Sequence, residues 1–171
     1  IAGSTWPADE ALLYNLSKSS SDDLKIVIAP HETNNEHIQN LMNLFGNQAV
    51  CYSKTNETEV LKYRILIIDS VGMLSQLFRY GSLAYIGGGF GVSIHNILEP
   101  ATFGLPVLFG PKMNKFKEAN DLIELNSAFV IHNSEELISR VQHLLKNQEI
   151  LTETGARCKK YVEENKGATS I

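Results

Sequence analysis

The sequence predicts an α/β fold with a doubly wound parallel sheet that is covered by helices on both faces. The first observation is that continuous apolar runs of strand length alternate along the chain with segments of helical spacing. Strands buried on both faces have such apolar runs, and their alternation with helices is typical of a parallel sheet. The second observation is that glycine, proline or polar residues follow these runs. Ligands bind such sheets at the carboxyl ends of the strands, so we expect these residues to surround one site.

Seven segments account for the predicted sheet. The first is the tail of a strand within residues 1–6, which runs into a Gly-Ser-Thr turn. The other six are the apolar runs at residues 24–29, 49–52, 65–68, 83–86, 106–109 and 128–131. Because no repeat, low-complexity tract or linker interrupts this series, we expect one domain over residues 1–171.

Helical segments lie between and after these strands. Apolar residues spaced by three and four predict helices at residues 8–17, 38–45, 74–80, 97–103, 116–125, 135–146 and 150–164. Thr5 can cap the first helix, and Pro7 suits its first turn. Gly46 is expected to end the second helix, and Ser134 to cap the helix at residues 135–146.

Composition restricts the class of protein. Apolar residues make up 43% of the chain, charged residues 20%, and the net charge is −4, which suits a soluble globular domain and not a nucleic-acid binder with a basic stripe. Cys51 and Cys158 lie far apart in no metal-ligand spacing, so we interpret them as free thiols of a reducing compartment. No apolar run approaches the length of a bilayer and no signal peptide is visible. A start at Ile1 without methionine suggests a domain excised from a longer protein.

The most informative stretch is YIGGGFGVSIHNILEPATFGLPVLFGP at residues 85–111, which predicts a strand, a glycine loop, a helix and a strand. The glycines at 87–89 would let a ligand approach the backbone, and the N–H groups of the helix start favour an anion such as a phosphate. Asn96 and Glu99 are three residues apart, which places them on one helical face. A carboxylate there can hold the hydroxyls of a ribose. A tight turn and a capped helix would explain the same residues without a ligand.

Five loops are expected to converge on this edge of the sheet, at residues 3–5, 30–32, 70–72, 87–89 and 110–111. Two of their residues, Ser4 and Thr5, can be helix caps as readily as ligand contacts. For Glu32 we prefer a structural or binding role, because no partner for acid–base chemistry is visible near it. His37, His132 and His143 fall on expected surfaces, where we interpret them as solvated. The sequence shows no Ser-His-Asp order and no metal-ligand cluster.

A family likeness runs through these same segments. In order, GSTWPADE, IAPHE, IDSVGML, the block from YIGGG to GLPVLFGP and the NKFKEA segment resemble the C-terminal half of 3-deoxy-D-manno-oct-2-ulosonic acid (Kdo) transferases. The resemblance spans nearly the whole chain and implies the C-terminal half of a GT-B fold, in which two Rossmann-like domains face a cleft. It implies an inverting glycosyltransferase that uses CMP-Kdo as donor and no metal or other cofactor. The chain would be the donor-binding domain, without the N-terminal domain that binds the lipid A precursor.

The resemblance also assigns roles to individual residues. It implies that Glu99 binds the ribose and that the helix start lies beside the phosphate. The implied donor-binding residues are Ser4, Thr5, His31, Gly72, Met73, Gly88, Gly89, His95, Asn96 and Glu99. No catalytic residue is expected in this domain, because the proposed carboxylate lies in the absent domain. The full-length protein would work in lipopolysaccharide biosynthesis at the cytoplasmic side of the bacterial inner membrane, whereas this domain would be soluble and inactive alone.

The chain departs from the family pattern at three places. The family commonly has an arginine and a histidine after the second-strand proline, where this chain has His31 and Glu32. A glycine pair usually precedes the His-Asn motif, where this chain has Ser93 and Ile94. Met73 stands where the family commonly has glutamate. These departures concern the contacts to the donor carboxylate and phosphate.

Other functions fit the same pattern of residues. One alternative keeps the GT-B fold but takes a UDP-sugar, as in a transferase or epimerase. Another is an NAD-binding module, although the chain lacks the spaced G-x-G-x-x-G motif and the acidic residue after the next strand. A third is a non-catalytic nucleotide-binding or interaction domain.

Overall fold

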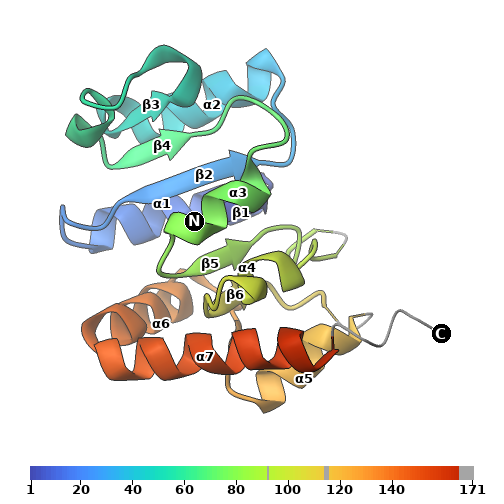
Figure 1. Cartoon of the computed structure of the whole chain (residues 1–171). Coiled ribbons are helices and arrows are strands. Elements are labelled where there is room, and N and C mark those ends of the chain that lie inside the picture. The colour runs from blue at the N-terminus through green and yellow to red at the C-terminus, as the bar shows by residue number, and fades with distance from the viewer. Residues whose placement is uncertain (92, 114–115, 166–171) are drawn as a thin grey trace.

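The computed structural model describes residues 1–91, 93–113 and 116–165. Seven strands form one sheet in the order β3-β4-β2-β1-β5-β6-β7 (Figure 1). Every pair of neighbours is parallel. The strands are β1 Ala2–Thr5, β2 Ile26–Pro30, β3 Ala49–Cys51, β4 Ile65–Ile67, β5 Ala84–Ile86, β6 Val107–Phe109 and β7 Ala128–Val130. The predicted α/β fold with a parallel sheet is therefore confirmed.

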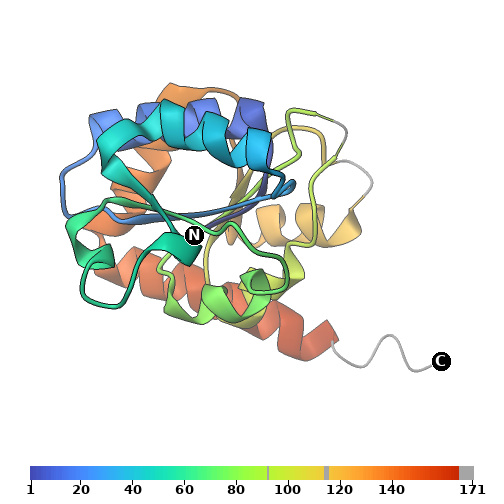
Figure 2. The ribbon, with the colours of Figure 1, turned by 90° about the horizontal axis from the view of Figure 1, so that it is seen from above.

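Helices cover both faces of the sheet, as the view from above in Figure 2 shows. They are α1 Pro7–Ser19, α2 Asn35–Phe45, α3 Leu74–Leu77, α4 Leu98–Thr102, α5 Lys117–Glu124, α6 Ser134–Lys146 and α7 Gln148–Asn165. One apolar core joins α1, α2 and α6 to the sheet through residues such as Leu13, Phe45 and Leu144. The other core joins α3, α4, α5 and α7 to the opposite face through residues such as Ala101 and Cys158. Burial on both faces explains why the strands are continuous apolar runs.

The direction of winding reverses beside β1. From β1 the chain first builds β2, β3 and β4 on one side, and it then crosses to build β5, β6 and β7 on the other. The connections after β1 and β5 leave the sheet in opposite directions, which opens a crevice at the carboxyl ends of these two central strands. The topology therefore places the glycine loop after β5 next to the turn after β1.

Two predicted helix caps are wrong. Thr5 does not cap α1, because the capping position belongs to Trp6, whose N–H donates to the side chain of Asp9 (2.9 Å). The cap of α6 is Asn133 and not Ser134, since the Asn133 side chain accepts from the N–H of Glu136 (2.9 Å). Gly46 ends α2 as predicted, and its N–H donates to the carbonyl of Met42.

Candidate functional site

A cavity of about 330 Å³ lies in this crevice at the carboxyl edge of the sheet. Its lining includes five residues that the sequence predicts to bind a ligand, namely Ser4, Gly72, His95, Asn96 and Glu99. They come from the end of β1, the loop before α3, the segment that leads into α4 and the first turn of α4 itself. Leu74, Phe78 and Ile86 give the same cavity an apolar wall. The structure therefore brings half of the predicted binding residues around one space.

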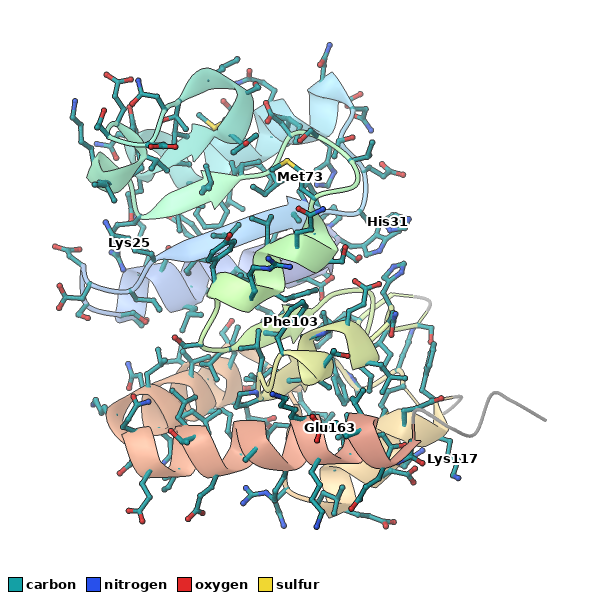
Figure 3. All side chains as sticks on the ribbon, in the orientation of Figure 1. Lys25, His31, Met73, Phe103, Lys117 and Glu163 are labelled. Carbon is teal, nitrogen blue, oxygen red and sulfur yellow. The ribbon has the colours of Figure 1, made fainter. Side chains whose placement is uncertain are left out.

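A larger hollow of about 730 Å³ lies at the opposite edge of the sheet and includes Lys25, Tyr80 and Leu145 in its lining. None of the predicted binding residues lines it. Figure 3 shows the two edges, with His31 beyond the carboxyl end of β2 and Lys25 before its amino end. Because parallel sheets bind ligands at their carboxyl edge, we take the smaller cavity as the candidate site.

A backbone irregularity at the end of β1 turns Ser4 into the cavity. The pairing of β1 with β2 shifts register between Gly3 and Thr5, and Ser4 has a positive φ of 54°. Such values are uncommon for residues other than glycine, and they are typical of bulges and functional sites. As a consequence, Ser4 lines the cavity while Thr5 is buried and donates its hydroxyl to Glu10 Oε1 (3.0 Å).

The glycines after β5 are required by close backbone packing. A Cβ on Gly87 would overlap the carbonyl oxygen of Ser4, and one on Gly88 would overlap that of Ser93. A Cβ on Gly89 would lie 2.6 Å from the Cα of Gly110. Gly88 and Gly89 support the residues that line the cavity, since the loop they form packs against the turn after β1 and the loop after β6.

Asn96 and Glu99 lie on one face, as their spacing predicts. Asn96 Nδ2 donates to Glu99 Oε1 (3.2 Å), and Asn96 Oδ1 accepts from the N–H of Leu98 (3.0 Å) at the start of α4. Helix α4 has five residues and is shorter than the predicted helix at residues 97–103. A macrodipole needs several aligned peptide units, so α4 adds less positive potential to the cavity than a longer helix would. Attraction for an anion has to come mainly from side chains.

Three aromatic rings are stacked in a column at the edge of the cavity. The Trp6 and His31 rings have centroids 4.5 Å apart, and His31 is 4.6 Å from the ring of His95. Burial and the positive charge of His31 lower the pKa of His95 from its ordinary value, while Asp9 acts in the opposite direction. His31 is exposed and His95 is half-buried. The column holds two imidazoles in place, and one of them, that of His95, lines the cavity together with Asn96 and Glu99.

Asp9 and Tyr85 were not predicted as part of the site. Asp9 is buried, and its carboxylate accepts hydrogen bonds from the Tyr85 hydroxyl (2.7 Å) and from the N–H groups of Trp6 (2.9 Å) and Gly88 (3.0 Å). In the sequence an aspartate in the first turn of a helix is explained by the helix dipole alone. No signal in the sequence therefore distinguishes Asp9 from an exposed first-turn acid.

The other five predicted binding residues lie outside the cavity lining, namely Thr5, His31, Met73, Gly88 and Gly89. Met73 follows Gly72, and its sulfur accepts the hydroxyl of Ser70 (3.2 Å). Glu32 is exposed, and its carboxylate accepts from Asn34 (3.4 Å). The prediction that His37 is solvated is wrong, because its Nε2 lies 2.8 Å from the buried carboxylate of Glu10.

Several predictions concern the rest of the chain. His132 and His143 are exposed, as expected, and Cys51 and Cys158 are free thiols, both of them buried. Within residues 1–91, 93–113 and 116–165, no group of three or more histidine, cysteine, aspartate or glutamate side chains could hold a metal ion. The helices described for these ranges are too short or too polar to cross a membrane.

The chain is similar in sequence to 3-deoxy-D-manno-octulosonic acid transferases. It is 31% identical to the enzyme of Aquifex aeolicus over 164 residues, which cover 92% of this chain and 45% of that protein. It is also 31% identical to the enzyme of Rickettsia typhi over 173 residues, which cover 96% of this chain and 37% of that protein. The chain thus spans less than half the length of these curated relatives. No protein-family model matches it.

Among solved structures, the chain is similar to the C-terminal CMP-Kdo binding domain of WaaA from Acinetobacter baumannii. The TM-score is 0.82 at 19% identity, and the match covers 95% of this chain and 87% of that one. WaaG, a glycosyltransferase involved in lipopolysaccharide biosynthesis, matches with a TM-score of 0.62 at 14% identity over 94% of this chain and 40% of its own. These two matches bear on the fold, and the sequence matches bear on ancestry. The chain is therefore a homologue of the 3-deoxy-D-manno-octulosonic acid transferases, with the fold of a GT-B C-terminal domain.

Proposed function

We propose that the chain is the donor-binding domain of an inverting glycosyltransferase that transfers Kdo from CMP-Kdo to a lipid A precursor in lipopolysaccharide biosynthesis. One observation carries the proposal. Residues that are far apart in the sequence, Ser4, Gly72 and the group His95, Asn96 and Glu99, line a single cavity at the switch point of the sheet. The similarity to the transferases indicates which nucleotide this cavity would bind.

The cavity suits a nucleoside monophosphate in size and chemistry. Its volume of about 330 Å³ is at the small end of the range for small-molecule sites. The carboxylate of Glu99 can accept hydrogen bonds from two adjacent ribose hydroxyls, and Asn96 can both donate and accept. The hydroxyl of Ser4 and the imidazole of His95 can donate to the phosphate. Leu74 and Phe78 offer apolar surface to the base.

The other side of the reaction cleft would lie in a second domain. We expect that domain to bind the lipid A precursor, to contact the inner membrane and to supply the catalytic carboxylate. The transfer would need no metal ion or other cofactor. Holding both substrates in register supplies a large share of catalysis, so the donor domain alone should bind its nucleotide and transfer nothing.

The proposal is tested first by ligand specificity. Calorimetry and thermal unfolding of the 171-residue chain should show that CMP binds and stabilises it more than UMP, UDP or NAD does. A preference for UDP would favour a transferase or epimerase that uses a UDP-sugar, and a preference for NAD would favour a dinucleotide module. Equal effects of all four ligands would contradict a nucleotide site of any of these kinds.

The division of labour is tested by an activity assay. The chain alone, given lipid A precursor and CMP-Kdo generated in place, should form no product above background. Adding the preceding domain of the natural protein should restore turnover. Transfer by the 171-residue chain alone would place the base among the residues described above, and Glu32→Gln would be the first variant to assay.

A further inference from the structure

The carboxylate of Asp9 lies behind the candidate site and not in its lining. It is fully buried in the first turn of α1. Oδ2 accepts hydrogen bonds from the backbone N–H groups of Trp6 (2.9 Å) and Gly88 (3.0 Å), and Oδ1 accepts from the Tyr85 hydroxyl (2.7 Å). An ionised carboxylate can only accept, and all three partners donate. The contacts therefore suit the charged form of Asp9.

These three donors belong to three parts of the fold. Trp6 lies in the turn after β1, Tyr85 in β5 and Gly88 in the glycine loop. Burial and the charge of Asp9 both raise the pKa of Tyr85, so its hydroxyl remains a donor. A Cβ on Gly87 would lie 2.8 Å from Asp9 Oδ2, which shows how closely the loop packs on the carboxylate. Asp9 therefore joins the turn after β1, close to Ser4 in the chain, to the loop that leads to His95.

The hydrogen bonds alone do not require a charge at this position. An amide of the same shape could accept the two N–H groups with its oxygen and donate to the Tyr85 hydroxyl with its nitrogen. Burying a charged group is costly unless its partners compensate for the loss of water. The hydrogen bonds therefore do not explain why the residue at this position carries a negative charge.

The neighbouring ring of His95 gives a role to the negative charge of Asp9. Its Cδ2 is 3.3 Å from the position that a Cβ on Gly88 would take, and the N–H of Gly88 donates to Asp9. Gly88 thus separates the carboxylate from the imidazole. The groups that act on the charge of His95 include His31, whose ring lies 4.6 Å away and is tilted by 31°, and Asp9 on the other side of Gly88. Glu99 lines the same cavity.

We propose that Asp9 is a positioning residue of this site, which fixes the glycine loop to the turn after β1 and uses its negative charge to favour the protonated ring of His95. Protonated His95 attracts an anionic ligand, and the inference rests on the proposed function in taking that anion to be a nucleotide phosphate. The burial of His95 and the charge of His31 oppose protonation, so the carboxylate partly restores it.

The test compares two variants that separate charge from hydrogen bonding. Asp9→Asn removes the charge while its amide can keep all three bonds, and Tyr85→Phe removes one bond while it keeps the charge. The fluorescence of Trp6, the only tryptophan in the sequence, should keep its emission maximum in both variants if the turn stays in place. A change in the emission maximum for Asp9→Asn would overturn the claim that the charge of Asp9 can be removed while its hydrogen bonds are kept.

The first measurement is a proton NMR titration of the histidine rings without ligand, in which His95→Gln identifies the signal of His95. We expect the pKa of His95 to fall by about half a unit or more in Asp9→Asn, because a nearby opposite charge favours the charged form. Tyr85→Phe should leave that pKa close to its value in the unchanged protein. An unchanged titration in Asp9→Asn would overturn the proposal, since a structural carboxylate would have no such effect.

The second measurement is the affinity for CMP between pH 5.5 and pH 8. The affinity should rise as the pH falls through the pKa of His95, and the midpoint should move to lower pH in Asp9→Asn by the same amount as the NMR titration. A midpoint that stays in place would overturn the link to the ligand. Failure of the unchanged protein to bind CMP at any pH would contradict the proposed function, while the NMR titration would still decide the role of Asp9.

Discussion

Gly87, Gly88 and Gly89 stand in backbone so closely packed that none of them has room for a Cβ, whereas a Cβ on Gly72, which lines the cavity, would meet no atom of the described residues within 4 Å. The first three support the site from behind and fix the turn after β1. Gly72 has a positive φ of 89°, and its neighbour Val71 is 82% exposed. Glycine is therefore required at residues 87–89 by close packing, and at Gly72 by the conformation of the backbone.

This contrast between the two loops shows which parts of the site are fixed before a ligand binds. The loop at Gly87 is held by backbone atoms of β1 and by the buried carboxylate of Asp9, neither of which can move away cheaply. In the part of the chain that the structure describes, no atom lies within 4 Å of the position that a Cβ on Gly72 would take. We expect substitutions in the loop at Gly87 to lower the free energy of unfolding strongly, and substitutions in the loop at Gly72 to lower it much less.

The largest expected effect is that of Gly87→Ala. The new methyl group would overlap the Ser4 carbonyl oxygen and lie 2.6 Å from Thr5 Cα, so the central strands would have to separate. We expect a loss of about 3 kcal/mol or more in the free energy of unfolding, measured by denaturant titration.

Gly91→Ala is the matched control in the same loop. Among the described residues, a Cβ there would meet only the Gly88 carbonyl oxygen, at an ordinary distance of 3.6 Å. This variant should unfold within about 0.5 kcal/mol of the unchanged protein. Equal losses in the free energy of unfolding for Gly87→Ala and Gly91→Ala would contradict the conclusion that Gly87 is closely packed and Gly91 is not.

Glu99→Ala should have the next largest effect, on binding and not on folding. The loss of a charged acceptor for the ribose should weaken CMP binding by about 1.5–3 kcal/mol, or roughly tenfold to more than a hundredfold, by calorimetry. The side chain accepts from Asn96 at the partly exposed rim of the site, so circular dichroism and the melting temperature should change little. Unchanged affinity with an intact fold would assign Glu99 a structural role.

The same contrast explains how much of the fold could be predicted. Continuous apolar runs identify the strands, since burial on both faces leaves no other composition for them, and β5 lies within the run predicted at residues 83–86. Glycines after two of these strands also point to the carboxyl edge of the sheet, where the candidate cavity lies. Local signals of this kind depend on neighbours in the sequence, which is why they predict the architecture and indicate a candidate edge for the site.

Contacts between distant segments could not be predicted in the same way. Thr5 and Ser4 are adjacent and similar in chemistry, and only the register shift at the end of β1 decides that Thr5 is buried and Ser4 lines the cavity. His37 meets Glu10 across two helices, 27 residues away. Asp9 meets Tyr85 and Gly88 across more than 70 residues. Such pairings depend on tertiary packing that periodicity does not encode.

Gly72→Ala is expected to cost about 1 kcal/mol, because a Cβ is disfavoured at positive φ although it has room there. Gly72→Asn should cost less, since asparagine tolerates this region better. Chemical denaturation of both variants would measure the difference. A loss for Gly72→Ala as large as that for Gly87→Ala would show that the Gly72 loop is also closely packed.

The smallest expected effect is a dependence of stability on pH through His95, which leans on the closely packed loop at Gly88. Burial and His31 lower the pKa of His95 in the folded protein below its value in the unfolded chain. At a pH below the ordinary value of about 6.5, the unfolded chain then binds more protons than the folded one. The free energy of unfolding should therefore be highest above that pH and should fall as the solution is acidified through the lowered pKa.

Denaturant titrations at pH 7.5, 6.5 and 5.5 should show that this free energy falls less steeply for His95→Gln than for the unchanged protein. His143→Gln, at an exposed position, is the control and should keep the steeper dependence. An equally steep pH dependence in His95→Gln would contradict the claim that the loop at Gly88 holds His95 in surroundings that lower its pKa.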